Sequence, residues 1–587
     1  MAEDGLSSGR GPDGFSRRGF MGAGAAFSAW LIANEVRVAE GASQPQSPLS
    51  LPGEEAPGLG GNDGAITKST VREAEKLAGL RYTDAERAMI VESIGGAERF
   101  NDRRAHQIPN GVGPATVFRV SADAPTADGP VIPGIADPGP LPASEEDIAF
   151  APVTSLSVWV RDRELTSTRL TRIYLERIKR LDPKLECIVT LTETLALEQA
   201  TQADREIAAG NYRGPLHGLP YGLKDLFDTE QIRTSFGAMP YKDRVPQSDS
   251  TVYRKLTEAG AVLIAKTTLG ALAYGDIWFD GRTNNPFNLD EGSSGSSAGS
   301  ASGTAAGLFA FSIGTETLGS IVSPSMRCGT TGLRPTFGRV GRGNAMALCW
   351  SLDKVGPICR GVEDTALVLS ALNGHDPLDA SSVASGFTYD GTRSVRGMRV
   401  GYSPAWFAEG AADDIDRKAF EELRQVGVEL VEIELPDLPY GALYTQLIGE
   451  AAAAFEEITL TNSDDTMKWQ EPQAWPNSFR TAWFTPMIEL IQADRIRRQI
   501  VVEMDRIFGD EENGLDCLFG PSFAGPMLLI TNYTGHPQLC LRAGFRDNGT
   551  PKGVSVWGRL YGEEKVCRLG AALERRLGVA SRRPDLS

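Results

Sequence analysis

Apolar residues recur at helical intervals through the N-terminal third of the chain. This spacing predicts helices over Thr70–Leu80, Thr83–Ile94, 155–160, Thr166–Leu181 and Leu191–Ala209. Thr70 and Thr83 are expected to be N-caps, because each stands three residues before a glutamate that can complete a capping box. The first two helices would form a short helical extension ahead of the main domain.

From about residue 221 the pattern changes to short apolar runs that alternate with helical segments. The segments are Tyr221–Leu223, Thr251–Ala259, Ala261–Ala265, Ala298–Phe309 and Ala310–Thr315. Strands and helices in alternation predict an α/β fold. We expect a single large domain with a mixed central sheet that helices cover on both faces.

Composition divides the chain into four parts. Residues 43–66 are rich in Pro, Gly and Ser and predict a flexible linker after residues 1–42. Residues 67–152 form a helical and irregular extension whose Pro/Gly-rich part, 103–146, is expected to be a surface strap, and 153–587 form the main domain. Within that domain, 437–508 is mainly helical, and its aromatic residues either pack in the core or line a substrate pocket.

The N-terminus carries a targeting pattern. Arg17-Arg18 stand between Ser16 and Phe20, and the apolar run 21–33 follows, which resembles a twin-arginine export signal. The run is too short and too rich in Gly for a stable membrane span. Export predicts a periplasmic or secreted protein. The alternative is a disordered basic extension on a cytoplasmic one.

Charge and cysteine usage exclude several partners. The 587 residues carry a net charge of -17, which gives no general attraction to nucleic acid or anionic lipid. The seven cysteines contain no CxxC and no Cys/His cluster of zinc spacing, so we expect neither disulfides, a metal nor a cofactor. The expected partner is a small-molecule substrate, and the expected state is a monomer or homodimer.

Three segments carry candidate chemistry. Lys224 stands in GLPYGLKDLFD, Ser296 in SGSSAGSASGTAAGL and Ser320 in IGTETLGSIVSPS. Together these side chains supply a base, a hydroxyl relay and a nucleophile. The four histidines do not predict a Ser-His-Asp triad, because no GxSxG elbow accompanies them.

From Ser296 to Ser320 the chain resembles, without a gap, the signature of the amidase signature family, GGSSGGS followed by GTDTGGSI. GPLHGLPYGLKDLFDT, TNNPFNLDEGSSGSSAGS and CGTTGLRPTFGRV extend the resemblance. It implies that Ser320 is the nucleophile, that Ser296 follows a cis peptide bond and passes protons, and that Lys224 is the base. The backbone N–H groups of Thr317, Leu318, Gly319 and Ser320 would hold the oxyanion.

Lys224 must be neutral to accept a proton. Its pKa must fall by about three units from about 10.4, at a cost of roughly 4 kcal/mol, through burial and nearby donors. Asp225 would oppose this shift if its carboxylate pointed the same way. Ser297 is expected to cap the helix that begins at Ala298 rather than to take part in catalysis.

The chain departs from the family pattern at three positions. Leu318 replaces a glycine, which matters only if that residue needs positive φ. Glu316 replaces the usual Asp. Val322 replaces an arginine, and we expect Arg327 to reach the same carboxylate instead.

These features favour a periplasmic hydrolase of small, aryl or peptide-terminal amides. The main alternative is the glutamine-hydrolysing subunit of a tRNA-dependent amidotransferase, which works in the cytoplasm with a partner. A second alternative is a binding protein that keeps the fold and has lost turnover through Leu318 and Val322.

Overall fold

The computed structural model describes residues 66–94, 109–114, 116–120, 122–134, 137–510 and 513–586. The predicted export signal and almost all of the linker therefore lie outside the described residues. In the described part, no helix is long and apolar enough to cross a membrane.

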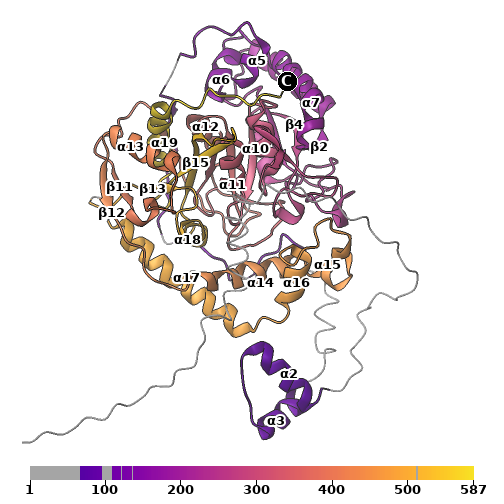
Figure 1. The fold of residues 1–587 in the computed structure, drawn as a ribbon. Coiled ribbons are helices and arrows are strands. Elements are labelled where there is room, and N and C mark those ends of the chain that lie inside the picture. The colour runs from indigo at the N-terminus through magenta and orange to yellow at the C-terminus, as the bar shows by residue number, and fades with distance from the viewer. Residues whose placement is uncertain are drawn as a thin grey trace, which may run out of the picture. The chain divides into compact units, whose positions relative to one another are not determined.

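An eleven-stranded sheet lies at the centre of the main domain (Figure 1), with the strand order β12-β11-β13-β15-β14-β8-β9-β7-β3-β4-β2. Its strands are, in chain order, β2 (Ile188–Leu191), β3 (Pro220–Lys224), β4 (Val262–Thr267), β7 (Phe311–Glu316), β8 (Thr331–Arg334), β9 (Lys354–Cys359), β11 (Arg399–Tyr402), β12 (Glu429–Glu432), β13 (Cys517–Pro521), β14 (Gln538–Phe545) and β15 (Pro551–Gly558). Neighbours run parallel in β12-β11-β13 and β7-β3-β4 and antiparallel elsewhere. The mixed α/β fold is confirmed.

Two short ladders lie outside this sheet. β1 (Val131–Ile132) pairs with β10 (Tyr389–Asp390), and β5 (Asn284–Asn285) pairs with β6 (Asn288–Gly292).

Helices cover both faces of the sheet. The Leu539 side chain lies against Gly570 of α19, whereas Gly332, which pairs with the next residue Cys540, faces Ser325 of α11. Successive strand residues point to opposite faces, so α19 and α11 lie on opposite sides. The helices are α2 (Lys68–Ala78), α3 (Asp84–Ile94), α5 (Glu145–Phe150), α6 (Val153–Arg161), α7 (Ser167–Leu185), α8 (Glu193–Ala208), α9 (Thr251–Glu258), α10 (Ala298–Ala305), α11 (Val322–Cys328), α12 (Val362–Leu372), α13 (Asp414–Gln425), α14 (Tyr444–Ala454), α15 (Glu456–Leu460), α16 (Trp475–Ala482), α17 (Met487–Phe508), α18 (Met527–Thr534) and α19 (Glu563–Leu577).

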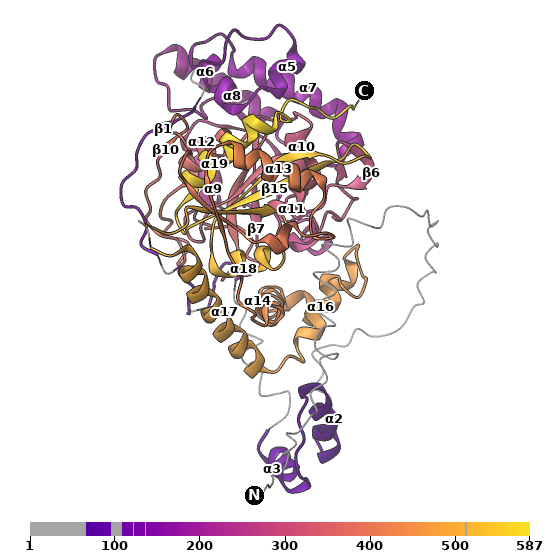
Figure 2. The ribbon, with the colours of Figure 1, turned by 60° about the vertical axis from the view of Figure 1, so that its left-hand side comes forward.

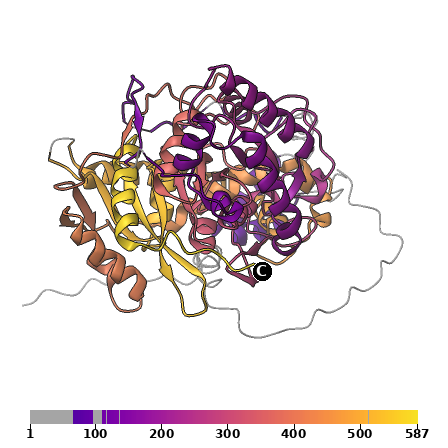
Figure 3. The same cartoon turned by 90° about the horizontal axis from the view of Figure 1, so that it is seen from above.

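Short 3-10 turns complete the connections: η2 (Met239–Tyr241), η3 (Ala271–Ala273), η4 (Pro404–Phe407), η5 (Tyr440–Leu443) and η6 (Ser463–Thr466). Viewed from above, the C-terminal strands with α19 and the N-terminal helices α5–α8 lie at opposite ends of the domain (Figure 3). This matches the sheet order, in which β2 is one edge and the β13-β15-β14 group lies toward the other.

The N-terminal helices correct one predicted cap. α2 begins at Lys68 with Thr67 as N-cap, because the Thr67 hydroxyl accepts the Thr70 N–H at 3.3 Å. Thr70 is therefore the third helical residue, and its prediction as N-cap was wrong. Thr83 does cap α3, since its hydroxyl accepts the Glu86 N–H at 3.3 Å. Leu191 ends β2 rather than beginning a helix, and α8 starts at Glu193.

The Pro/Gly-rich strap contacts the main domain at several points. The Asn110 amide donates to the carbonyls of Ala347 and Ala454 at 2.9 and 3.2 Å. Further along, β1 pairs with β10, and the Gly134 N–H donates to the Glu363 carboxylate at 2.8 Å. These contacts give hydrogen-bond partners in the main domain to polar groups of the strap.

The sequence left open whether the aromatic residues of 437–508 pack in the core or line a substrate pocket. Trp475 and Phe479 are buried and stack at 5.0 Å between ring centroids. The Trp475 ring also donates to the Leu272 carbonyl at 3.0 Å, which links α16 to η3. Trp483 and Phe484, in contrast, are exposed. Of these four side chains, the first two belong to the core, as do Phe455 and Phe508 of the same stretch.

Candidate active site

Lys224 ends the central strand β3, between β7 and β4, and its side chain is completely buried. Its ammonium nitrogen Nζ lies 2.8 Å from Ser296 Oγ, 3.0 Å from Ser297 Oγ and 2.9 Å from Thr315 Oγ1. Three hydroxyl groups therefore surround the nitrogen. This predicted base and the predicted relay serine are in direct hydrogen-bond contact.

Burial determines the charge state of Lys224. Removal from water lowers its pKa to about 7, against the opposing attraction of the Asp353 and Glu316 carboxylates. The hydroxyl partners are neutral and solvate either form. Near neutral pH a large fraction of the amine is thus available to accept a proton.

Asp225 points away from Lys224. One of its oxygens lies 3.2 Å from Nζ of Lys266, and both side chains are fully buried. The other oxygen accepts the Ser235 N–H at 2.8 Å. A second lysine therefore neutralises the neighbouring carboxylate, and Asp225 is absent from the groups that raise the pKa of Lys224.

The two serine segments are joined through their backbones. The Ser297 N–H donates to the Ser320 carbonyl at 3.0 Å, and the peptide bond between Gly295 and Ser296 is cis, as the resemblance implies. Ser320 is 7% exposed and lies just before α11. The fold thus brings the segments of all three predicted catalytic residues together.

Ser297 has a different role from the one predicted. It occupies the N-cap position of α10, but its side chain makes no capping hydrogen bond. Its hydroxyl instead accepts from Lys224 and from the Thr315 N–H at 3.2 Å, and donates to the Thr315 carbonyl at 3.1 Å. The capping prediction was wrong, because the buried amine and strand β7 offer this hydroxyl stronger partners.

The predicted oxyanion turn runs from Thr317 to Ser320. Its left-handed residue is Gly319, with φ of 86°, and Leu318 is not among the described residues with positive φ. The leucine therefore fits this turn without backbone strain. Within the described residues, none of the four N–H groups from 317 to 320 meets a protein acceptor. They remain free to bind a substrate oxygen.

Glu316 is hydrogen-bonded to the two residues that follow the turn. One carboxylate oxygen accepts the N–H groups of Ile321 and Val322 at 2.9 and 3.0 Å, and the other binds the Arg334 guanidinium at 2.6 Å. Burial opposes ionisation, but the charge of Arg334 and these donors lower the pKa of Glu316 to about 2. The carboxylate therefore stays ionised.

Arg334, rather than Arg327, pairs with the Glu316 carboxylate. The prediction for Arg327 was wrong, because its guanidinium binds Glu291 at 3.0 Å instead. Arg334 ends β8, and the order β8-β9-β7 places it near the end of β7 that carries Glu316. Asn532 on α18 adds a hydrogen bond of 2.9 Å to the same carboxylate.

Sequence reasoning missed three residues that support the site. Thr315 binds the Lys224 amine, and Asp353 accepts the Thr317 hydroxyl at 2.6 Å. Asn532 contacts Glu316 from more than 200 residues away in the chain. Thr315 could have been found, since it lies within the quoted serine segment. Asn532 comes from a distant segment and carries no local signal.

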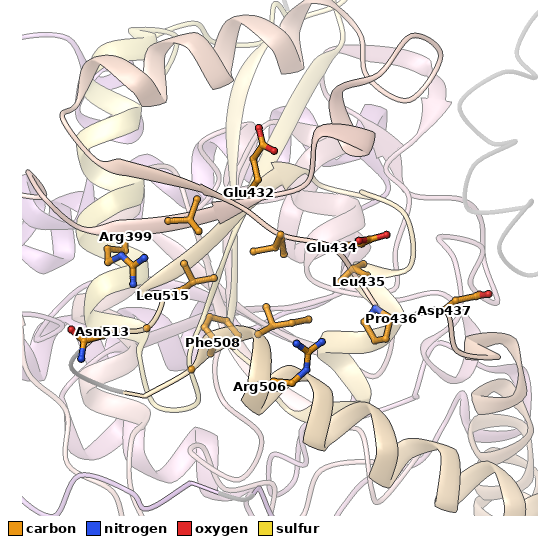
Figure 4. A pocket seen from close by; sticks show the side chains of 15 residues that line it. Arg399, Glu432, Glu434, Leu435, Pro436, Asp437, Arg506, Phe508, Asn513 and Leu515 are labelled. Carbon is orange, nitrogen blue, oxygen red and sulfur yellow. The ribbon is translucent and has the colours of Figure 1, made fainter.

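A surface pocket of about 650 Å³ lies elsewhere, between the end of β12 and the C-terminal end of α17 (Figure 4). Arg399, Arg506 and Phe508 line it, and none of the three predicted catalytic residues does. In the described part of the chain, no group of three or more His, Cys, Asp or Glu side chains is arranged to hold a metal ion. All seven cysteines are buried and free.

Comparison with known proteins places this site in a family. A model of the Amidase family matches residues 169–531. One subunit of the glutamyl-tRNA(Gln) amidotransferase of Geobacter metallireducens is 33% identical over 468 residues, which cover 71% of this chain and 95% of that protein. The corresponding subunit from Heliobacterium modesticaldum is 31% identical over 472 residues, with coverage of 72% and 96%. The crystal structure of native peptide amidase from Stenotrophomonas maltophilia is 30% identical, with a TM-score of 0.65 and coverage of 74% and 99%.

Proposed function

The chain belongs to the amidase family of enzymes that hydrolyse carbon–nitrogen bonds, and we propose that it cleaves a carboxylic amide through an acyl-enzyme on Ser320. The single observation that carries this proposal is the buried contact of 2.8 Å between Lys224 Nζ and Ser296 Oγ. A neutral amine beside a hydroxyl relay can accept the proton that a serine nucleophile must lose.

In the first half of the reaction, Ser320 Oγ attacks the amide carbonyl and gives its proton to Ser296 Oγ. Ser296 passes its own proton to Lys224 Nζ. The N–H groups of the turn 317–320 bind the oxygen on which negative charge develops. Glu316 keeps that turn in place through its bonds to the first residues after Ser320.

In the second half, the protonated Lys224 returns its proton through Ser296 to the leaving nitrogen, and ammonia or an amine departs. Water then attacks the Ser320 ester by the same route in reverse and releases the carboxylate. The proton that leaves with the amine is replaced by one from the attacking water. The three side chains therefore end in their starting protonation states, and the balance needs no cofactor.

Two substrate classes are candidates. The curated relatives support the side-chain amide of glutamine better than the small, aryl or peptide-terminal amides that the sequence first suggested. The peptide amidase structure supports the second class, since this chain covers nearly all of that enzyme. We propose glutamine as the first substrate to test and C-terminal peptide amides as the second.

Localisation follows the same division. Glutamine hydrolysis for an amidotransferase corresponds to the cytoplasmic alternative with a partner protein, and a peptide or aryl amidase corresponds to export. The twin-arginine segment lies outside the described residues, so export stays a prediction from the sequence alone.

The decisive experiment combines labelling with turnover. A fluorophosphonate should label the purified chain at Ser320, and a Ser320→Ala variant should not react. Ammonia release from glutamine and from a panel of peptide and aryl amides then identifies the substrate class. An unlabelled chain that hydrolyses none of them would support the alternative of a non-catalytic binding protein and overturn the proposal.

A further inference from the structure

The turn between α16 and α17 exposes a cluster of large apolar side chains. We call it the apolar tip, and its exposed fractions are Trp483 42%, Phe484 65%, Met487 73%, Ile488 64%, Leu490 37% and Ile491 54%. With roughly 150 Å² or more per large side chain, the exposed area is on the order of 500 Å². The largest patch of a typical monomer is about 300–600 Å² and is often functional.

The tip extends away from the body of the domain. No residue from 480 to 492 is buried, and α17 first buries a side chain at Ala493. From there one face packs inward, through Arg497, Ile500 and Met504. α14, α16 and α17 lie on the same outer side of the large sheet in both side views (Figures 1 and 2). The first turns of α17 therefore expose apolar residues where a surface helix would ordinarily carry polar ones.

Basic residues continue the same helix face. Arg495 and Arg498 follow Ile491 by four and seven residues, so they lie above it on one side of α17, and both are exposed. Glu489 is on the opposite side of the helix. Asp494, three residues after Ile491, is also exposed, and it accepts the Gln446 amide of α14 at 3.4 Å. The exposed face thus passes along the helix axis from apolar residues to two arginines and one aspartate, with a net positive charge.

This order matches the profile of a lipid interface. Arg495 lies about 6 Å along the axis from Ile491 and about 12 Å from Met487, at 1.5 Å per residue. Apolar side chains of interfacial segments reach about 5–10 Å into the boundary between headgroups and acyl chains. If α17 enters by its N-terminal end, Arg495 therefore lies near the phosphates when Met487 reaches this depth. Trp and Phe suit the same boundary.

A second copy of the chain fits the tip less well. Two tips would bury about 1,000 Å² in total, and stable protein interfaces bury about 1,200–2,000 Å². In an antiparallel pair of α17 helices that cross at Ile491, Met487 would also meet Arg495 of the other copy. The exposed charge pattern therefore favours lipid.

We propose that the apolar tip inserts into the headgroup boundary of a lipid bilayer, with Arg495 and Arg498 at the level of the phosphates. The chain would then lie on a membrane surface without a spanning segment. This inference does not depend on the proposed amide hydrolysis.

The test measures binding of the full chain to vesicles of phosphatidylcholine alone and with one-fifth phosphatidylglycerol, by co-sedimentation. A Met487→Ser, Ile491→Ser double variant should lower the partition coefficient at least tenfold on both vesicle types. The matched control is Leu77→Ser with Met89→Ser, whose side chains on α2 and α3 are 63% and 61% exposed. The control should bind within twofold of the unchanged chain. All changed side chains are exposed, so the thermal unfolding midpoint should not move.

A charge variant tests the assigned orientation. Arg495→Gln with Arg498→Gln should weaken binding to the phosphatidylglycerol vesicles about tenfold at low salt and leave binding to phosphatidylcholine nearly unchanged. Three results would overturn the proposal. The first is no binding to either type of vesicle, and the second is an equal loss of binding in the α2–α3 control. The third is a dimer in sedimentation equilibrium that the Met487/Ile491 variant dissociates, because this would identify a second copy as the occupant.

Discussion

The ionisation of Lys224 should set the pH dependence of turnover. The proposed mechanism requires the neutral amine, so kcat/KM should rise with pH through about 7 and then reach a plateau. At pH 5, two units below that value, about 1% of the amine is neutral, and the rate should be about 100-fold below the plateau. An exposed lysine with its pKa near 10.4 would instead give a rate that still rises above pH 9.

The same shift predicts a change in stability. Between about pH 7 and 10.4 the unfolded chain holds a proton on this lysine and the folded chain does not. The free energy of unfolding should therefore rise with pH over this window. A shift of about 3.5 units corresponds to about 4–5 kcal/mol from this group alone. Lys224→Met should remove this slope in urea unfolding measured at pH 7 and pH 9.

Lys224→Arg provides the sharpest variant. Arginine keeps the positive charge and cannot lose its proton near neutral pH, so it should be as inactive on amides as Lys224→Ala. Both variants should keep proportionally more activity on esters, because an ester leaving group needs less protonation. The assay is kcat/KM from pH 5 to 10 on a matched amide and ester. Amide hydrolysis by Lys224→Arg at a near wild-type rate, or a profile flat between pH 5 and 8, would refute a role of Lys224 as base.

Three further predictions test neighbouring features. Ser296→Ala should lower kcat by several orders of magnitude with the fold intact, whereas Ser297→Ala should cost about 10–100-fold, because the Lys224 amine keeps its other hydroxyl partners. Equal losses in single-turnover measurements would mean that the relay serine is misassigned. Glu316→Gln leaves a buried arginine without its counter-charge and should destabilise the chain by about 3–5 kcal/mol in urea unfolding, and an unchanged midpoint would contradict that pairing. Replacing Arg17-Arg18 by two lysines should keep the protein in the cytoplasm of its host, and continued export seen by cell fractionation would exclude the twin-arginine pathway.

The sequence was sufficient where chemistry is encoded in a contiguous motif. Lys224, Ser296 and Ser320 stand in three short segments, and the structure brings those segments together. Local preference misled at Ser297, since serine is common at N-caps and the competing amine comes from a strand 73 residues away. It also misled at Thr70, because the Thr67–Thr70 pair forms a capping box of its own without the expected glutamate.

Long-range pairing could not be predicted from the chain. Arg327 and Arg334 are both close to Ser320 in sequence, and only the strand order β8-β9-β7 decides which of them reaches Glu316. Similarly, the aromatic residues of 437–508 share one helical pattern, yet Trp475 is buried and Phe484 is exposed. The difference depends on which aromatic residues reach Leu272 and Tyr274, as Trp475 does, and this is a property of the whole fold.

The environment of Lys224 shows how the fold keeps a buried amine partly neutral near pH 7 while it can still accept a proton. Three carboxylates lie close to it in the fold or the sequence, those of Asp225, Glu316 and Asp353, and the first two are paired with buried cations. Asp225 is paired with Lys266 and Glu316 with Arg334, at 3.2 and 2.6 Å, and each cation is itself buried. The carboxylates of Asp353 and Glu316 still raise the pKa of Lys224, but by less than burial lowers it. Desolvation then remains the largest influence on the Lys224 amine, and its pKa falls to about 7.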